Sequence, residues 1–147
     1  MEAGVDYIGI CTPFYCNDGK GNFLLHKRGD KCRDEKGRWD TGSGQLEFGQ
    51  SPSESVLREL KEEYGLTGEI QEQLPAHSIL RENNGKKTHW LSIPFFIKAD
   101  IKSAKIMEPE YASEIGVFRL DALPSPLHTG LQKTMSMFPE HFKKYME

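Results

Sequence analysis

The sequence predicts an α/β domain in which a mixed β-sheet lies between helices. Three observations predict this class: extended apolar segments occur before and after one strongly patterned helical segment, a second helical segment lies near the end of the chain, and no repeat or low-complexity stretch intervenes. The 147 residues, 37% hydrophobic and 10% aromatic, suffice for one core. We therefore expect a single domain over residues 1–147.

The first elements are two extended segments joined by a turn. A strand is predicted over residues 7–15, in which Pro13 indicates an edge position or a bulge. A turn signal at residues 17–19 precedes a second strand at residues 22–27. The polar, glycine-containing stretch 28–40 is expected to form a surface loop.

The clearest element is a helix from about Pro52 to Tyr64. Ser51 can cap it, Pro52 suits its first position, and Glu54 stands three residues after the cap, as a capping box requires. Gly65 is a natural C-terminal stop. The apolar residues repeat on one helical stripe, at Val56, Leu57, Leu60 and Tyr64.

Further strands follow this helix. Residues 77–81 and 88–97 read as two strands, with a hairpin-turn signal at Asn84-Gly85 between them. Another strand is expected over residues 115–120. Residues 131–146 are predicted to be helical, with Pro139 marking a break or a new start.

Charge and composition exclude several classes of protein. The chain has 19 Lys and Arg against 22 Asp and Glu, which argues against a nucleic-acid binder that relies on bulk positive charge. No apolar run approaches the ~20 residues of a membrane span, and the first residues do not resemble a signal peptide. The three cysteines form no CxxC pair, so we expect packed thiols and a cytoplasmic location.

Three glutamates share one face of the predicted helix. Glu59, Glu62 and Glu63 stand at i, i+3 and i+4, and the single neighbouring Arg58 does not balance them. A hard divalent cation such as Mg²⁺ would balance them, because it prefers carboxylate oxygens. Spacing alone leaves a solvated acidic face as the alternative, since charge runs are common on helices.

The residues flanking the helix favour the cation site. From Gly44 to Leu66 the sequence closely resembles the Nudix box, GX5EX7REUXEEXGU, in which U is an aliphatic residue. Every fixed position agrees except one, because Gln50 stands where the pattern has its first glutamate. The motif is 23 residues long and highly specific. The chain thus resembles the small, single-domain, MutT-like members of the Nudix hydrolase family.

The resemblance implies an α/β/α sandwich and a metal-dependent pyrophosphohydrolase that uses Mg²⁺ or Mn²⁺. In the family, water attacks a diphosphate that links a nucleoside to another group X. The resemblance assigns catalysis and metal binding to Glu59, Glu62 and Glu63. It implies further metal contacts for Ser43 and Glu114, and substrate contacts for Arg28, Trp39 and Glu47. From the residues alone, Arg28 and Glu114 read equally well as surface residues and Trp39 as a core aromatic.

The remaining box residues have structural roles in the family, and they are Gly44, Gln50, Arg58 and Gly65. The glutamate normally found at position 50 pairs with the arginine that matches Arg58. Glutamine keeps the size and accepts a hydrogen bond but loses the charge. We therefore expect activity to survive with weaker metal binding.

An active hydrolase is favoured over two alternatives. A catalytically weakened Nudix-fold nucleotide-binding or sensing module is supported only by Gln50, and a generic interaction domain is disfavoured by the intact glycine loop. Nucleoside triphosphates or similar small nucleotides are mildly favoured as substrates by analogy. Many relatives dimerise, which leaves a homodimer open. We expect residues 42–49 and the helix to form one wall of a cleft bounded by residues 28–40 and the Asn84-Gly85 hairpin.

Overall fold

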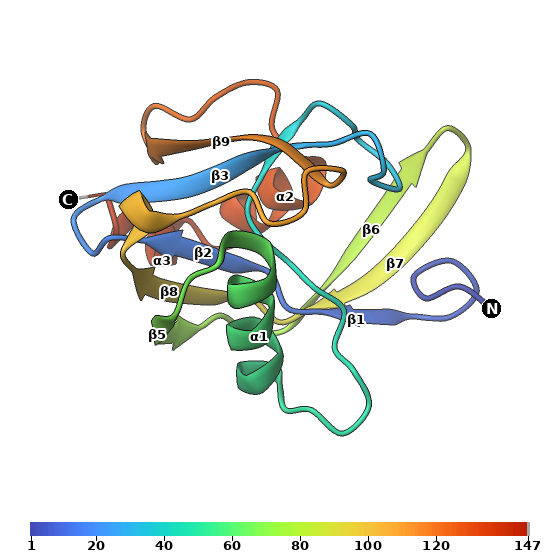
Figure 1. Cartoon of the computed structure of the whole chain (residues 1–147). Helices are drawn as coiled ribbons and strands as arrows, with labels where there is room; N and C mark the ends of the chain where they lie inside the picture. Colours follow the sequence, from blue (N-terminus) through green and yellow to red (C-terminus); the bar gives the residue numbers. More distant parts are fainter. Residues whose placement is uncertain (147) are drawn as a thin grey trace.

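The computed structural model describes residues 1–146, and two β-sheets form its centre (Figure 1). The strands are β1 (Gly9–Cys11), β2 (Phe14–Asn17), β3 (Asn22–Arg28), β4 (Trp39–Asp40), β5 (Gly68–Gln73), β6 (His77–Asn83), β7 (Lys86–Ser92), β8 (Phe95–Ala99) and β9 (Ala112–Arg119). The larger sheet has the order β4-β3-β2-β8-β5, with β9 also paired to β3, and the smaller sheet has the order β1-β7-β6.

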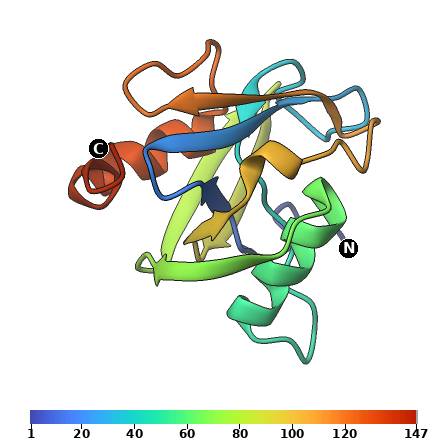
Figure 2. The same ribbon diagram turned by 60° about the vertical axis from the view of Figure 1, so that its left-hand side comes forward.

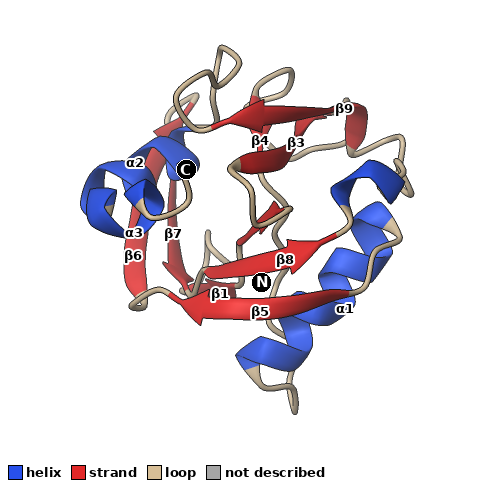
Figure 3. Ribbon diagram, turned by 90° about the vertical axis from the view of Figure 1, so that its left-hand side faces the viewer, coloured by secondary structure: helices blue, strands red, loops and turns tan. Residues whose placement is uncertain are grey.

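Helices cover both faces of the larger sheet (Figures 2 and 3). They are α1 (Pro52–Tyr64), α2 (Thr129–Met137) and α3 (Pro139–Lys143), and a short 3₁₀ helix spans Ile101–Ser103. Among residues 1–146, no helix has the length and apolar character that a membrane span requires.

Alternating strand residues build two separate cores. Phe14 of β2 and Leu24 of β3 pack with Leu60 of α1, whereas the intervening Tyr15 of β2 packs with Phe142 of α3. Because successive side chains of a strand point to opposite faces, one sheet serves both helical layers. The predicted α/β/α sandwich with a mixed sheet is confirmed.

Helix α1 has the predicted bounds because its ends are specified locally. The Ser51 hydroxyl accepts a hydrogen bond from the Glu54 amide at 3.2 Å, and the Glu54 carboxylate accepts from the Ser51 amide at 3.3 Å. At the other end, Gly65 adopts φ 69° and its amide donates to the Lys61 carbonyl. A positive φ costs glycine little, so the helix ends there.

Two predicted strands are each divided between the sheets. Residues 7–15 form β1 in the small sheet and β2 in the large one, and residues 88–97 form β7 and β8 in the same way. The chain changes sheet at Pro13 and at Pro94, since proline has no amide hydrogen to continue a ladder. The two segments pass from the smaller sheet to the larger one side by side, because β1 pairs in parallel with β7 and β2 pairs in parallel with β8.

The other differences lie at the ends of elements. The helical segment begins earlier than expected, at Thr129, and Phe138 separates α2 from α3 just before Pro139. The hairpin turn at Asn84-Gly85 is confirmed, with φ of 54° and 78° at its two residues. Strand β5 was not predicted, because most of its residues are polar and it lies at the edge of the larger sheet.

Candidate active site

A single cleft of about 740 Å³ brings the predicted functional segments together. One wall consists of the glycine loop 42–49 and α1, and the other consists of the loop 29–38, strand β6 and the start of α2. The side chains of β6, rather than the hairpin turn at Asn84-Gly85, line the cleft. The lining of the first wall includes Ser43, Gly44, Glu47, Arg58, Glu59, Glu62 and Glu63.

Arg58 organises the acidic wall. Its Nη1 lies 2.8 Å from Glu59 Oε1 and 3.0 Å from Glu62 Oε2. Its Nη2 donates to Gln50 Oε1 at 3.3 Å and lies 3.6 Å from Glu47 Oε1. One guanidinium therefore contacts three carboxylates, so the wall keeps an excess of negative charge.

Glu63 is the least compensated member of this wall. Burial raises its pKa well above the usual value, and the nearby charge of Glu59 raises it further. Burial also raises the pKa of Glu59, although the Arg58 charge opposes this shift. The Glu63 Oε2 atom is shielded from solvent and has no hydrogen-bond partner within residues 1–146. A buried carboxylate oxygen without a hydrogen-bond partner destabilises the fold unless a ligand binds it.

Gly44 allows the glycine loop to approach this pair. A Cβ atom at Gly44 would lie 2.1 Å from the Glu59 Cδ atom. Main-chain hydrogen bonds fix the loop, since the Thr12 amide donates to the Gly44 carbonyl and the Phe14 amide to the Gly42 carbonyl, both at 2.9 Å. The carboxyl group of Glu59 thus sits against bare backbone, where any larger residue would displace it.

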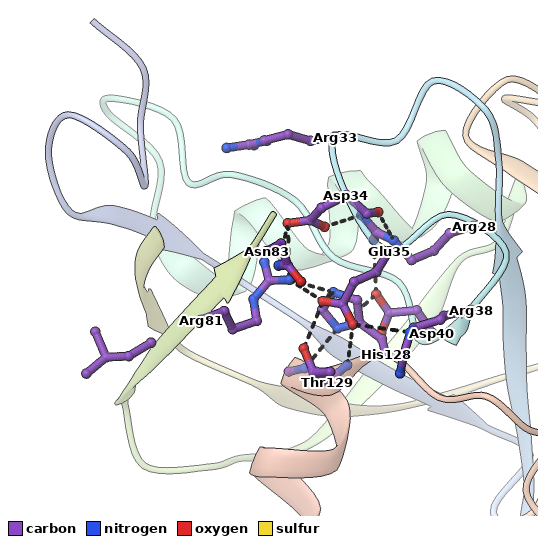
Figure 4. A network of polar contacts seen from close by, with 12 residues as sticks. Arg28, Arg33, Asp34, Glu35, Arg38, Asp40, Arg81, Asn83, His128 and Thr129 are labelled. Atoms are coloured by element: carbon purple, nitrogen blue, oxygen red, sulfur yellow. Dashed lines mark hydrogen bonds and ion pairs between the residues drawn. The ribbon is translucent and has the colours of Figure 1, made fainter. Parts of the chain in front are cut away.

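The opposite wall is a network of ion pairs (Figure 4). Arg28 lies 3.2 Å from Asp34 and 3.3 Å from Asp40, while Arg81 lies 3.2 Å from Asp34 and also contacts Glu35. The combination of arginines and carboxylates leaves this wall close to neutral, in contrast to the acidic wall.

Three residues of the network lie close enough to suggest a metal site. The candidate ligand atoms of Asp34, Glu35 and His128 fall within 4.8 Å of one another. Arginines already compensate both carboxylates, however. His128 Nδ1 accepts a hydrogen bond from the Gly130 amide at 3.1 Å, which leaves Nε2 of the neutral ring protonated. We therefore read this group as an ion-pair network.

Comparison with known proteins places the chain in a family. The family model described as NUDIX domain matches residues 10–138. The chain belongs to the NUDIX family. The prediction of a Nudix pyrophosphohydrolase is confirmed by this match together with the similar structures.

Solved Nudix structures share this fold. The MutT NUDIX hydrolase from Burkholderia pseudomallei is 25% identical, with 89% of this chain and 98% of that chain covered and a TM-score of 0.77. The MutT protein from Methanosarcina mazei Go1 is 24% identical, with 91% and 94% covered and a TM-score of 0.69. A UDP-X diphosphatase is 16% identical, with 99% and 67% covered and a TM-score of 0.70. The last two structures are less than 25% identical to this chain, and they show that the folds are alike.

Two predicted site residues lie away from the Nudix cleft. Glu114 is exposed on β9, where it pairs with Lys27 of β3, and it is absent from the cleft lining. Trp39 packs edge-on against Phe118 with ring centroids 5.2 Å apart, as its alternative reading as a core aromatic requires. The structure therefore does not support a metal contact for Glu114 or a substrate contact for Trp39.

Glu108, rather than Glu114, is the late acidic residue of the cleft lining. It lines the cleft, and burial raises its pKa, as do the charges of Glu62 and Glu110. Its loop is tied to the end of the Nudix helix, since the Met107 amide donates to the Glu63 carbonyl at 3.3 Å. The acidic Glu108-Pro109-Glu110 segment was its only sequence signal, and the position of a loop residue depends on tertiary contacts.

Proposed function

We propose that the chain hydrolyses the diphosphate linkage of a nucleoside diphosphate joined to a group X, with a divalent cation held by Glu59, Glu62 and Glu63. The observation that carries this proposal is the close Glu59–Glu63 pair in the cleft wall, with its unpartnered Glu63 oxygen. Mg²⁺ is the cation we favour, with Mn²⁺ as the alternative, because hard oxygen ligands suit both.

The residues present fit such a cation. Two neighbouring carboxyl groups in a partly desolvated wall repel each other, and one of them takes up a proton when no cation is near. Glu59 and Glu63 would hold a divalent cation, whose charge would remove this repulsion and compensate the unpartnered oxygen of Glu63. Ser43 lines the same part of the cleft, and we keep it as a further candidate ligand.

When bound, the cation neutralises phosphate oxygens and lowers the pKa of a coordinated water. The chain contributes positioning and proton transfer. Arg58 fixes the orientation of Glu59 and Glu62 through ion pairs of 2.8 and 3.0 Å. Glu108 has no side-chain hydrogen bond or ion pair within the described residues, and we propose it as the group that accepts the proton of the attacking water.

The opposite wall would hold the rest of the substrate. The cleft volume of about 740 Å³ lies within the range of roughly 300–1,000 Å³ typical of small-molecule sites. We favour nucleoside triphosphates or similar small nucleotides, and Arg28 and Glu47 stay as candidate contacts in the lining. A cytoplasmic location, a homodimer and a single domain over residues 1–147 stay predictions.

A nucleotide panel tests the proposal directly. Phosphate release should require Mg²⁺ or Mn²⁺, and Glu62→Gln should slow it strongly, whereas Glu69→Gln on the exposed edge strand β5 should not. Turnover by Glu62→Gln at the wild-type rate would contradict the metal-site assignment. Nucleotide binding by the wild type without any turnover over the whole panel would favour the binding or sensing module instead.

A further inference from the structure

The loop between β3 and β4, residues 29–38, bridges the two walls of the cleft. On the side of Glu108, the Gly29 amide donates to the Tyr111 carbonyl and the Lys31 amide to the Glu110 carbonyl, both at 2.9 Å. On the other side, Asp34 and Glu35 join the network of Arg81 and the start of α2. Lys31, whose amide makes one of these contacts, and Arg33 line the cleft. The Arg33 guanidinium also donates to the Ala3 carbonyl at 3.2 Å and lies 3.4 Å from Glu2 Oε2.

Hydrophobic packing holds this loop only weakly. Cys32 is its one buried apolar side chain, and its thiol donates to the Tyr111 carbonyl at 3.2 Å. The other residues are charged or glycine. The free energy that orders the loop must therefore come mainly from polar contacts, because ordering a backbone is costly in conformational entropy.

Glu35 makes the densest set of these contacts. Its Oε1 accepts from the Thr129 amide at 2.9 Å, and its Oε2 accepts from the Thr129 hydroxyl at 2.8 Å and from Arg81 (Figure 4). His128 Nε2 lies 3.3 Å from the same Oε2, and Arg38 Nε lies 3.8 Å from Oε1. Only 4% of the Glu35 side chain is exposed, so both of its oxygens are occupied by protein donors.

Two further features indicate that this arrangement is specific. Glu35 has a φ of 47°, a conformation that a non-glycine residue adopts only when its surroundings require it. Its carboxylate also lies at the N-terminus of α2, where the helix dipole favours negative charge. Although burial alone would raise the pKa of Glu35, the hydrogen bonds from Thr129 and the charge of Arg81 bring it below the usual value.

We propose that Glu35 is a positioning residue, whose carboxylate clamps loop 29–38 across the cleft and so presents Lys31 and Arg33 to the anionic substrate. This inference rests on the proposed function of the cleft. Glu35 itself does not touch the substrate, because its oxygens are taken by Thr129 and Arg81. When the clamp is absent, substrate binding must supply the free energy that orders the loop, so affinity falls while the chemical step at the acidic wall is unchanged.

Steady-state kinetics separate positioning from a general loss of structure. For Glu35→Ala we expect KM to rise roughly tenfold or more, the effect of losing one hydrogen bond to a charged group, with kcat changed by less than about twofold. Glu35→Gln keeps one acceptor oxygen for Thr129 but loses the second acceptor and the charge, and it should give a smaller rise in KM. Lys36→Ala, an exposed neighbour in the same loop, is the matched control and should leave both constants unchanged. A fall in kcat with KM unchanged would overturn the inference.

The Thr129 side of the clamp gives a second variant that leaves the loop sequence intact. Thr129→Val removes one donor to Glu35, and we expect the same direction of change in KM. If both substitutions act through one contact, their effects in the double variant will be less than additive. Should Glu35→Ala fail to fold by circular dichroism, Thr129→Val and Glu35→Gln decide the question, and unchanged KM in both refutes the clamp.

Tryptophan fluorescence tests the loop without any turnover. Arg33 lies over the Trp90 ring, 5.2 Å from its centroid, so release of the loop alters the surroundings of Trp90. In a Trp39→Phe background, Trp90 is the sole tryptophan. Glu35→Ala should shift its emission and Lys36→Ala should not. Unchanged emission would refute the clamp, whereas a wild type without turnover would count against the proposed function and not against the clamp.

Discussion

Glu63→Gln is the substitution that tests the acidic wall most directly. It keeps the size of the side chain but removes its ability to carry charge beside Glu59. Because the metal-free protein holds a raised pKa at Glu63, its stability falls as pH rises above the usual carboxyl pKa of 4.5. The Glu63→Gln variant does not lose stability in this way, because its amide does not titrate. We therefore expect metal-free Glu63→Gln to be more stable than the wild type at neutral pH and equal to it at acid pH.

The size of the effect follows from the contacts. The new amide can donate to Glu59, and a hydrogen bond to a charged group contributes about 1.5–3 kcal/mol. In a chain of this length 1 kcal/mol shifts Tm by roughly 2–4 °C. The response to metal should be the reverse. Free Mg²⁺ at about a hundred times its Kd stabilises the wild type by about 2.7 kcal/mol, and the variant should gain much less.

Thermal unfolding with a chelator and with excess Mg²⁺, repeated across pH, measures both effects. Glu62→Gln is the control for metal-free stability, because the Glu62 side chain is 52% exposed and its loss should change the free energy of unfolding by no more than about 0.5 kcal/mol. A metal-free Glu63→Gln protein that is less stable than the wild type at neutral pH would refute the reasoning about charge repulsion in this wall.

Two further predictions concern the loop and the C-terminus. Gly44→Ala should weaken Mg²⁺ binding, measured by calorimetry, with a retained circular dichroism spectrum, because the new Cβ displaces the Glu59 carboxyl; unchanged affinity would contradict this. Glu72 contacts His141, Lys144 and Tyr145 at 2.8–3.0 Å, and although burial opposes it, these contacts lower its pKa. Its stabilising effect is therefore present above the usual pKa of 4.5 and lost as pH falls through the lowered value. The protection factors of the α3 amides, which correct for the slower intrinsic exchange at acid pH, should therefore fall on acidification in the wild type and not in Glu72→Gln.

Local chemistry explains which elements could be predicted from the sequence. The residues at its two ends, Ser51 and Gly65, specify where helix α1 begins and ends. The Asn84-Gly85 turn requires two positive φ angles, which this pair of residues readily adopts. The acidic face of α1 follows from the same helical periodicity. These features need no knowledge of distant contacts, which is why the sequence predicts them.

Features that depend on distant contacts were predicted incorrectly or not at all. The division of two strands at Pro13 and Pro94 depends on both segments crossing between the sheets together. Glu108 reaches the cleft because its loop is bonded to the end of α1, whereas Glu114, six positions later, follows the pleat of β9 to the surface. The Glu35 clamp joins residues 94 positions apart in the chain, and no local pattern marks such a pair.

The position of Gln50 explains how the acidic wall keeps its shape with one fewer charge. Its Oε1 accepts from Arg58 Nη2 at 3.3 Å, so the amide supplies the hydrogen bond that orients the guanidinium. A glutamate there would compete with Glu59 and Glu62 for the same positive charge. With glutamine, residues 44–66 carry five acids and two bases, a net charge of −3 that equals the excess of the whole chain. A divalent cation would offset two of these three charges. Compared with a glutamate at position 50, the neutral amide of Gln50 leaves the wall with bound cation closer to electroneutrality. The same loss of charge weakens the attraction of the empty wall for the cation.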